Sequence, residues 1–346
     1  MNRRTRLLTA AGRRLPRPDP PTASYLRRVR GELPRPLSRV VLGPVSRGIE
    51  LADQVLPTTP YAVGVRVYRP RRAAGPLPLL VNLHGGGFVF GNLSGADWLC
   101  GQLADRVGAV VVSVDYRLAP EHPAPAPYED AWAATCWLLE HASSLGADPA
   151  RAVIVGESAG GSLAALVTLA LRERRRSDPT ALDVVGQVLL YPSTDLTMTS
   201  ASATAMVDAP VLSKRAIDWY GRQYVPQGLA HSILPDDPRV SPLRAADHAD
   251  LPPALVVAAG LDPLRDDALG YAAALARAGV DVRTVLYPGA VHGFVSIPRF
   301  EPAAAQAPDE AVIHTLTATT HPQGWTSAQP ATVGAAVLEP FGVTAV

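Results

Sequence analysis

The sequence predicts an α/β fold in which a mostly parallel central sheet is covered by helices on both faces. Short apolar runs alternate with helix-like segments from residue 63 to residue 287, and this rhythm is typical of repeated strand–helix units. The run Leu77–Leu83 is almost continuously apolar, which indicates a strand buried on both faces of a parallel sheet. At 346 residues, with 47% hydrophobic content, one large domain is favoured over two small ones.

The elements follow from this alternation. An edge strand is predicted from Val63, because valines recur at every second position over residues 63–67. Buried strands are predicted at residues 77–83, 109–114, 152–155, 184–191, 254–259 and 282–287, and helices at residues 96–107, 128–143, 161–171 and 266–278. Residues 193–250 interrupt the alternation with polar loops around one amphipathic segment, residues 214–224. An insertion at this point of a sheet fold predicts a helical cap over a binding site.

Five segments are expected along the chain. They are an N-terminal arm that forms part of the cap (1–57), a first part of the α/β core (58–192), the cap insertion with its connecting loops (193–250), a second part of the core (251–300) and an irregular C-terminal tail (301–346). Residues 1–39 hold eleven arginines against two acidic residues, Asp19 and Glu32. A solvated helical arm is the simplest interpretation, and contact with a membrane surface or a polyanion is the alternative.

The bulk composition excludes several classes of protein. A net charge of +1 gives no reason to expect binding to nucleic acid. The two cysteines, Cys100 and Cys136, lie in apolar, helix-like segments and are expected to be buried thiols, not a disulfide. No apolar stretch approaches the roughly 20 residues that span a bilayer, and the apolar run after Arg6 is too short for a signal peptide. We therefore expect a cytoplasmic protein without stable membrane insertion.

The motif Gly156-Glu157-Ser158-Ala159-Gly160 predicts the centre of the site. It lies between a predicted strand and a predicted helix, as a nucleophile elbow does, and the small neighbours allow a tight turn that exposes the serine. A serine hydroxyl needs a base to remove its proton. Reactive groups of parallel sheets gather at the carboxyl ends of strands, and two histidines, His84 and His292, directly follow a predicted strand. His84 precedes three glycines and suits a backbone role, so His292 is the predicted base.

The base needs a carboxylate that fixes its tautomer and stabilises its protonated form. Asp262 follows the strand at 254–259 and is the predicted acid. Its alternative role is an N-cap, since it precedes Pro263 and a helix. Asp266 and Asp267 lie in the first turn of that helix, where the helix dipole already favours acids. The chain order of serine, acid and histidine is the one found in α/β-hydrolases.

A glycine run predicts the donors that would stabilise a developing oxyanion. Gly85, Gly86 and Gly87 follow a buried strand, and glycine lets backbone amides approach a substrate closely. A further donor is expected from the N–H of Ala159, at the start of the helix that follows Ser158.

Five motifs together resemble the hormone-sensitive-lipase-like family of bacterial carboxylesterases, over residues 60–300. They are His84-Gly85-Gly86-Gly87-Phe88, the run Asp115 to Glu121, Gly156-Glu157-Ser158-Ala159-Gly160-Gly161, Asp262-Pro263-Leu264-Arg265-Asp266 and His292-Gly293-Phe294. The resemblance implies an α/β-hydrolase fold, hydrolysis of short- to medium-chain acyl esters, and an oxyanion hole formed by Gly85, Gly86 and Ala159. It implies no metal or cofactor, and a homodimer is possible because family members often dimerise through a sheet edge.

Two departures from the family pattern are present. Glu157 stands where many relatives carry Asp, a variation that the family tolerates. Relatives usually end in an amphipathic helix soon after the histidine loop, whereas residues 302–346 are rich in Ala, Thr, Pro and Gln. Beyond a possible short helix at residues 308–316, this tail is predicted to be partly disordered and to pack poorly.

The sequence therefore predicts a serine carboxylesterase with a Ser158–His292–Asp262 triad and an acyl-enzyme intermediate, acting on a small acyl ester. The alternatives are another acyl hydrolase (an amidase, peptidase or lactonase), since fold does not fix the substrate, and a non-catalytic ligand receptor on the same fold. Leu212, Trp219 and Tyr220 could line the substrate pocket or belong to the ordinary core.

Overall fold

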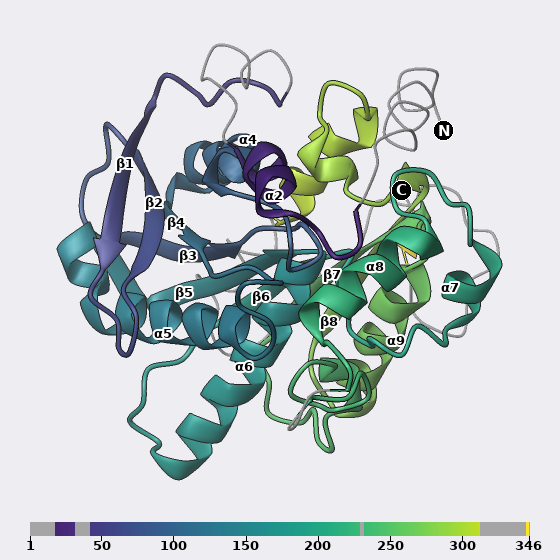
Figure 1. Ribbon diagram of the computed structural model, residues 1–346. Coiled ribbons are helices and arrows are strands. Elements are labelled where there is room, and N and C mark those ends of the chain that lie inside the picture. The colour runs from purple at the N-terminus through teal and green to yellow at the C-terminus, as the bar shows by residue number, and fades with distance from the viewer. Residues whose placement is uncertain (1–17, 32–41, 229–231, 312–343, 346) are drawn as a thin grey trace.

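The structure, a computed structural model, describes residues 18–31, 42–228, 232–311 and 344–345. Within these residues a nine-stranded sheet runs in the order β1-β2-β4-β3-β5-β6-β7-β8-β9 (Figure 1). Its strands are β1 (Ile49–Leu56), β2 (Val63–Pro70), β3 (Leu77–Leu83), β4 (Val110–Asp115), β5 (Ala147–Glu157), β6 (Gly186–Leu190), β7 (Ala254–Leu261), β8 (Val282–Val291) and β9 (Thr344–Ala345). Strands β1 and β2 are antiparallel to their neighbours, and the pairs from β4 to β9 are parallel.

Helices cover both faces of this sheet, as predicted. On one face lie α5 (Ala126–His141), α6 (Ala159–Ser177) and α9 (Arg265–Arg277). On the other face lies α4 (Leu93–Leu103), which continues into a π-helical turn at Ala104–Gly108 and packs beside 3-10 turns at Phe294–Ser296 and Pro302–Ala305 (Figure 1). A further 3-10 turn, Ala142–Leu145, follows α5. Each face buries its own apolar cluster, which is the layered core that a parallel sheet requires.

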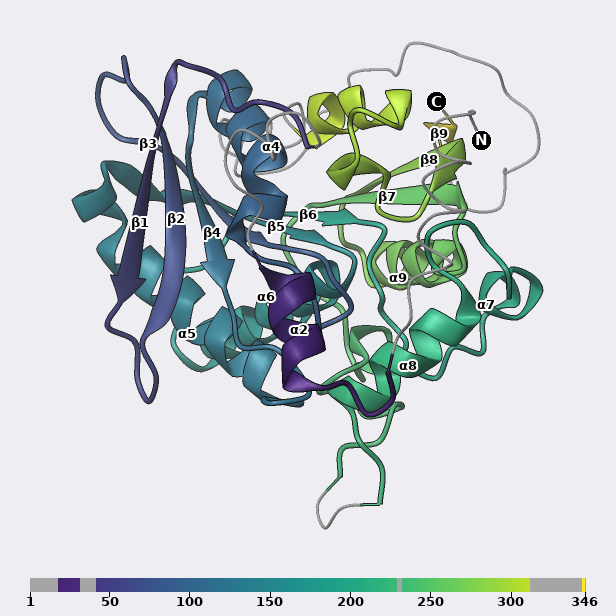
Figure 2. The ribbon, with the colours of Figure 1, turned by 45° about the horizontal axis from the view of Figure 1, so that its top comes forward.

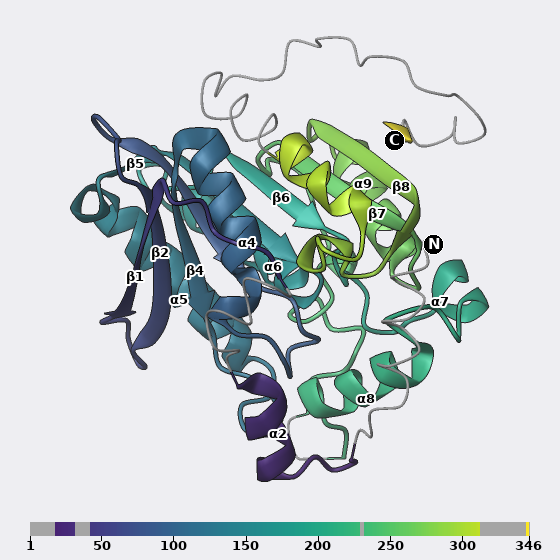
Figure 3. The same ribbon diagram turned by 90° about the horizontal axis from the view of Figure 1, so that it is seen from above.

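The cap is formed by two segments that are far apart in the sequence. The N-terminal helix α2 (Ala23–Arg30) lies beside α8 (Lys214–Tyr224) of the insertion in both Figure 2 and Figure 3. The insertion also holds α7 (Ala201–Ala205) and a 3-10 turn at Pro242–Arg244. Trp219 Nε1 donates a hydrogen bond to the carbonyl of Pro18 (2.9 Å), and Arg222 pairs with Asp19 (2.6 Å).

Two expectations about the ends of the chain are corrected. Residues 49–56, expected in the N-terminal arm, form strand β1 and pair with β2 along its whole length. The first part of the tail, expected to pack poorly, packs well: Ala304, Ala307 and Ala311 are buried in the core beside α4, and a short helix, as expected there, includes residues 307–311. The rest of the tail, for which disorder is expected, lies mostly outside the described residues, and so does the basic arm before residue 18.

The predicted buried strands and core helices are otherwise present, with shifts of a few residues at their ends. Cys100 is a buried free thiol and Cys136 a half-buried one. None of the helices in the described part of the chain is long and apolar enough to cross a membrane.

Candidate active site

Ser158 occupies a sharp turn between a strand and a helix. β5 ends at Glu157 and α6 begins at Ala159, so Ser158 alone makes the reversal, with φ 54° and ψ −117°. This conformation is uncommon for a residue with a side chain and is found where a site requires it. Glycine is required on both sides: a Cβ at Gly156 would lie 2.3 Å from the carbonyl oxygen of Gly160, and a Cβ at Gly160 would lie 2.0 Å from that of Leu83.

The predicted serine, histidine and aspartate lie in one hydrogen-bonded line. Ser158 Oγ is 2.8 Å from His292 Nε2, and His292 Nδ1 is 2.7 Å from Asp262 Oδ2. A carboxylate only accepts hydrogen bonds, so the proton of the neutral imidazole lies on Nδ1, and Nε2 is left to accept from the serine hydroxyl. All three side chains are buried, with Asp262 fully enclosed.

Strand register explains why Asp262 and His292 meet. Leu261, the last residue of β7, pairs with Val291, the last residue of β8, after a register shift that follows Ala259. The next residue of each strand is the acid or the base, so the two side chains leave the sheet edge together. The second carboxylate oxygen of Asp262 accepts the backbone N–H of Leu264 (2.9 Å). Asp262 thus holds the imidazole and also caps the turn that leads into α9.

The glycine run lies beside the elbow. Leu83, at the end of β3, pairs with Gly156 of β5, which brings the residues after it next to Ser158. Gly86 has φ 133°, and a Cβ there would lie 2.2 Å from the carbonyl oxygen of Phe90, so this loop tolerates only glycine at that position. Ala159 is the first residue of α6, where a backbone N–H has no acceptor within its own helix. The predicted donors Gly85 and Gly86 therefore lie in the loop after β3, and Ala159 begins α6, so both segments flank Ser158.

His84 has the structural position that the sequence predicts. Its ring stacks on Tyr116 at 4.3 Å, and Nδ1 lies 2.9 Å from the carbonyl oxygen of Gly85. Burial lowers the pKa of His84 to about 4, so the ring stays neutral at physiological pH. His84 supports the glycine run and does not contact Ser158.

The chain matches a known family over most of its length. The model of the alpha/beta hydrolase fold family matches residues 80–296, which is more than half of the chain. The chain belongs to this family. Among curated proteins it is 42% identical to the esterase LipI of Mycobacterium tuberculosis, over 78% of this chain and 82% of that protein. It is also 42% identical to the carboxylesterase NlhH of the same organism, over 71% of this chain and 75% of the relative.

A solved structure shares the whole architecture. The ester hydrolase EH1AB1 from the metagenome of Lake Arreo, in complex with a bipyridine phosphonate derivative, superposes with a TM-score of 0.81 at 39% identity. The match covers 92% of this chain and 98% of that one. These relatives confirm the resemblance to hormone-sensitive-lipase-like carboxylesterases and the predicted α/β-hydrolase fold.

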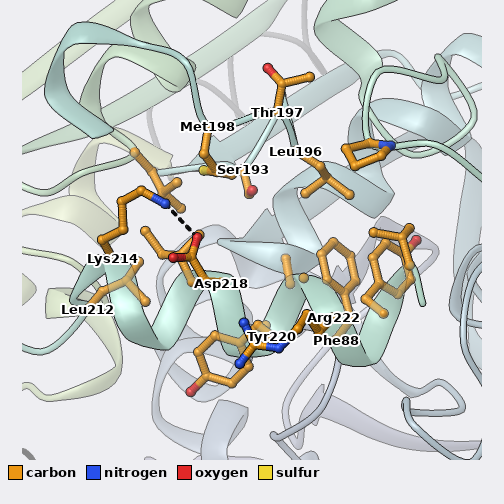
Figure 4. A pocket seen from close by; sticks show the side chains of 18 of the residues that line it. Phe88, Ser193, Leu196, Thr197, Met198, Leu212, Lys214, Asp218, Tyr220 and Arg222 are labelled. Atoms are coloured by element: carbon orange, nitrogen blue, oxygen red, sulfur yellow. Dashed lines mark hydrogen bonds and ion pairs between the residues drawn. The ribbon is translucent and has the colours of Figure 1, made fainter. Parts of the chain in front are cut away.

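Two cavities of this α/β-hydrolase meet at Ser158. The larger has a volume of about 370 Å³ and is mostly apolar, with walls from α8, the loop after β6 and Phe88 (Figure 4). The smaller, of about 290 Å³, is bordered by His292, Glu157 and the glycine run. Leu212 and Tyr220 line both cavities and form the wall between them.

The cap residues take different roles. Leu212 and Tyr220 line the pocket, as proposed from the sequence, whereas Trp219 is core: it is 3% exposed and its ring stacks against Phe90 at 5.5 Å. One contact in the pocket wall was not predicted: Lys214 and Asp218 form an ion pair at 2.7 Å (Figure 4). Their spacing of four residues on a predicted helix was the available signal.

The described residues contain no group of three or more histidine, cysteine or acidic side chains that could hold a metal ion.

Proposed function

We propose that this protein is a serine carboxylesterase in which Ser158 is the nucleophile, His292 the general base and Asp262 the residue that orients His292. The observation that carries the proposal is the continuous line from Ser158 Oγ to His292 to Asp262, with distances of 2.8 and 2.7 Å, at the junction of two cavities. The relatives named esterase and carboxylesterase support an ester as the bond that is cleaved.

The first half of the reaction acylates the enzyme. His292 Nε2 removes the proton of Ser158 as Oγ attacks the ester carbonyl carbon, and Asp262 stabilises the imidazolium. The carbonyl oxygen becomes an oxyanion, which would accept hydrogen bonds from the N–H groups of Gly85, Gly86 and Ala159. Each such donor contributes about 2.7–4 kcal/mol to the acceleration in comparable sites.

The position of His292 indicates which cavity would hold the alcohol group of the ester and which the acyl chain. When the tetrahedral intermediate collapses, His292 must give its proton to the oxygen of the departing alcohol, so the alcohol group lies on the side of His292. The smaller cavity borders His292 and would hold the alcohol, and the larger apolar cavity would hold the acyl chain. Water then enters from the alcohol side and its oxygen attacks the acyl carbonyl carbon while His292 takes its proton. The bond from that carbon to Ser158 Oγ breaks, His292 returns the proton to Oγ, and the acid leaves.

Cavity size supports short- to medium-chain acyl groups. A volume of about 370 Å³ is near the lower end of the range for small-molecule pockets, roughly 300–1,000 Å³. Its walls include Leu196, Met198 and Leu264, which suit a hydrocarbon chain.

The test is hydrolysis of p-nitrophenyl acetate and butyrate by the wild type and by Ser158→Ala. We expect the variant to lose at least about 10³-fold in kcat, because the attacking atom is absent. Ser162→Ala is the matched control: Ser162 lies one turn further along α6, and its buried hydroxyl has no partner among the described residues. Full turnover by Ser158→Ala would exclude the mechanism, and loss of activity in both variants would indicate damage to α6 instead.

A further inference from the structure

The residue before the nucleophile, Glu157, is a buried carboxylate that faces the loop carrying His292. It is 8% exposed. Ser296 donates its hydroxyl proton to both carboxylate oxygens, at 2.8 and 2.6 Å, and the phenol of Tyr191 donates to Oε1 at 2.9 Å. The side chain thus links the end of β5 to a residue four positions after His292.

Tyr191 makes a second link to the same loop. While its hydroxyl donates to Glu157, the oxygen accepts the backbone N–H of Val295 (3.2 Å). Its ring also meets the ring of His292 edge to face, with centroids 5.1 Å apart. The loop after β8 is therefore fixed at Val295 and Ser296, and the imidazole rests against Tyr191.

The environment of Glu157 disfavours the charged form of its carboxylate. Burial raises its pKa, and hydrogen bonds from Ser296 and Tyr191 and the nearby His292 act in the opposite direction. No lysine or arginine of the described residues forms a salt bridge with it. A buried carboxylate without a paired cation is a poor way to stabilise a fold, which points to a role in the site.

We propose that Glu157 is a positioning residue that holds the His292 loop against the nucleophile elbow, so that His292 Nε2 stays within 2.8 Å of Ser158 Oγ. This inference rests on the proposed function. Asp262 fixes the orientation of the imidazole ring through its hydrogen bond to Nδ1. Glu157 fixes the position of the backbone loop that carries His292, through Ser296. Because Glu157 and Ser158 are adjacent in the chain, the contacts of Glu157 hold the loop that carries His292 at a fixed distance from the nucleophile.

The test compares kcat and KM for Glu157→Gln, Ser296→Ala and the double variant, with p-nitrophenyl butyrate as substrate. The glutamine removes the negative charge and replaces Oε2, which accepts the shorter bond from Ser296, by an NH₂ group that cannot accept, so the bond between Ser296 and the elbow is weakened. We expect each single variant to lower kcat by about 5- to 30-fold, as misplacement of a base by a fraction of an ångström does, with KM within about twofold. The kcat of the double variant should be at most about twofold lower than that of the slower single variant, because both changes release the same loop.

Tyr191→Phe, with Tyr271→Phe as its control, keeps the inference testable if Glu157→Gln does not fold. Both tyrosines are fully buried, but Tyr271 lies on α9, its ring is part of the core, and its hydroxyl has no partner in the described structure. We expect Tyr191→Phe to lower kcat and Tyr271→Phe to leave it unchanged.

The two proposals fail in different ways. If Ser158→Ala abolishes activity while Glu157→Gln and Ser296→Ala keep wild-type kcat and change only the melting temperature, the positioning role is wrong and the esterase mechanism stands. Multiplicative losses in the double variant would likewise overturn the shared-loop argument. Activity that survives in Ser158→Ala removes the basis of both.

Discussion

Asp267 connects the cap insertion to the core, and its burial should make the stability of the protein depend on pH. The carboxylate lies in the first turn of α9, is 2% exposed, and accepts the backbone N–H of Asp195 at 3.2 Å. Burial, and then the negative charges of Asp195 and Asp262, raise the pKa of Asp267 from 3.8 to about 7, although hydrogen bonds from Asp195 N–H and Ser200 partly oppose this.

The sign and size of the effect follow from linkage. Between pH 3.8 and about 7 the folded protein holds a proton on Asp267 that the unfolded chain has lost, so stability falls as the pH rises through this range and is constant above it. The difference between 3.8 and about 7 corresponds to about 4 kcal/mol, at about 1.4 kcal/mol for each pH unit. About 3 kcal/mol of this cost develops between pH 5 and pH 8.5.

Asp267→Asn should remove this cost, since the amide is always neutral and its oxygen can still accept the N–H of Asp195. We expect the variant to be more stable than the wild type at pH 8.5, and the difference to shrink by about 3 kcal/mol at pH 5. Urea unfolding at both pH values, followed by circular dichroism, measures it. Asp237→Asn is the control, because hydrogen bonds from Arg239 lower the pKa of Asp237 and its titration falls below this window. An Asp267→Asn effect that is equal at both pH values would refute the reasoning.

Two predictions concern the loops around the site. Arg30 donates hydrogen bonds to the carbonyls of Val89 (2.7 Å) and Ala119 (2.6 Å). Arg30→Gln should therefore free the loop after the glycine run and lower kcat for p-nitrophenyl butyrate by about 10-fold, with little change in KM. An unchanged kcat would contradict this. The ring of Tyr220 packs on Gly87, 2.6 Å from where a Cβ would lie, and separates the two cavities. Tyr220→Ala should therefore join them and shift the preferred acyl chain by about two to four carbons in a series of p-nitrophenyl esters, and an unaltered profile would contradict the assignment of this wall.

The fold was predictable where burial leaves a pattern in the sequence. The central strands are buried on both faces and are read directly as apolar runs. Strand β1 was missed because it lies at the sheet edge: Ile49 and Leu56 are its buried residues, and those between them are exposed or half-buried. The packed start of the tail was missed for another reason. Ala304, Ala307 and Ala311 fill the core with small side chains, which give no amphipathic contrast in an alanine-rich stretch.

The triad residues were predictable because each directly follows a strand, and parallel strands bring their carboxyl ends together. The contacts around them were not. Glu157 meets Tyr191 and Ser296 across 34 and 139 residues of chain, and nothing local in the sequence marks these side chains as partners. A carboxylate directly before a predicted nucleophile was the one available signal, and it was interpreted only as a family variation.

The acyl cavity depends on contacts that join the two ends of the cap. Trp219 and Tyr220 are neighbours on α8, and both rings meet Phe90 at 5.5 Å. Trp219 also donates a hydrogen bond to the carbonyl of Pro18, whereas Tyr220 also packs on Gly87. The N-terminal segment therefore fixes the rotation of α8, and that rotation decides how far Tyr220 reaches between the cavities. If the larger cavity holds the acyl chain, as proposed, substrate preference should depend on this pairing across 201 residues. A change at residues 18–19 should alter acyl preference without touching the substrate, whereas the hydrogen-bonded line of Ser158, His292 and Asp262 starts from the ends of β5, β8 and β7.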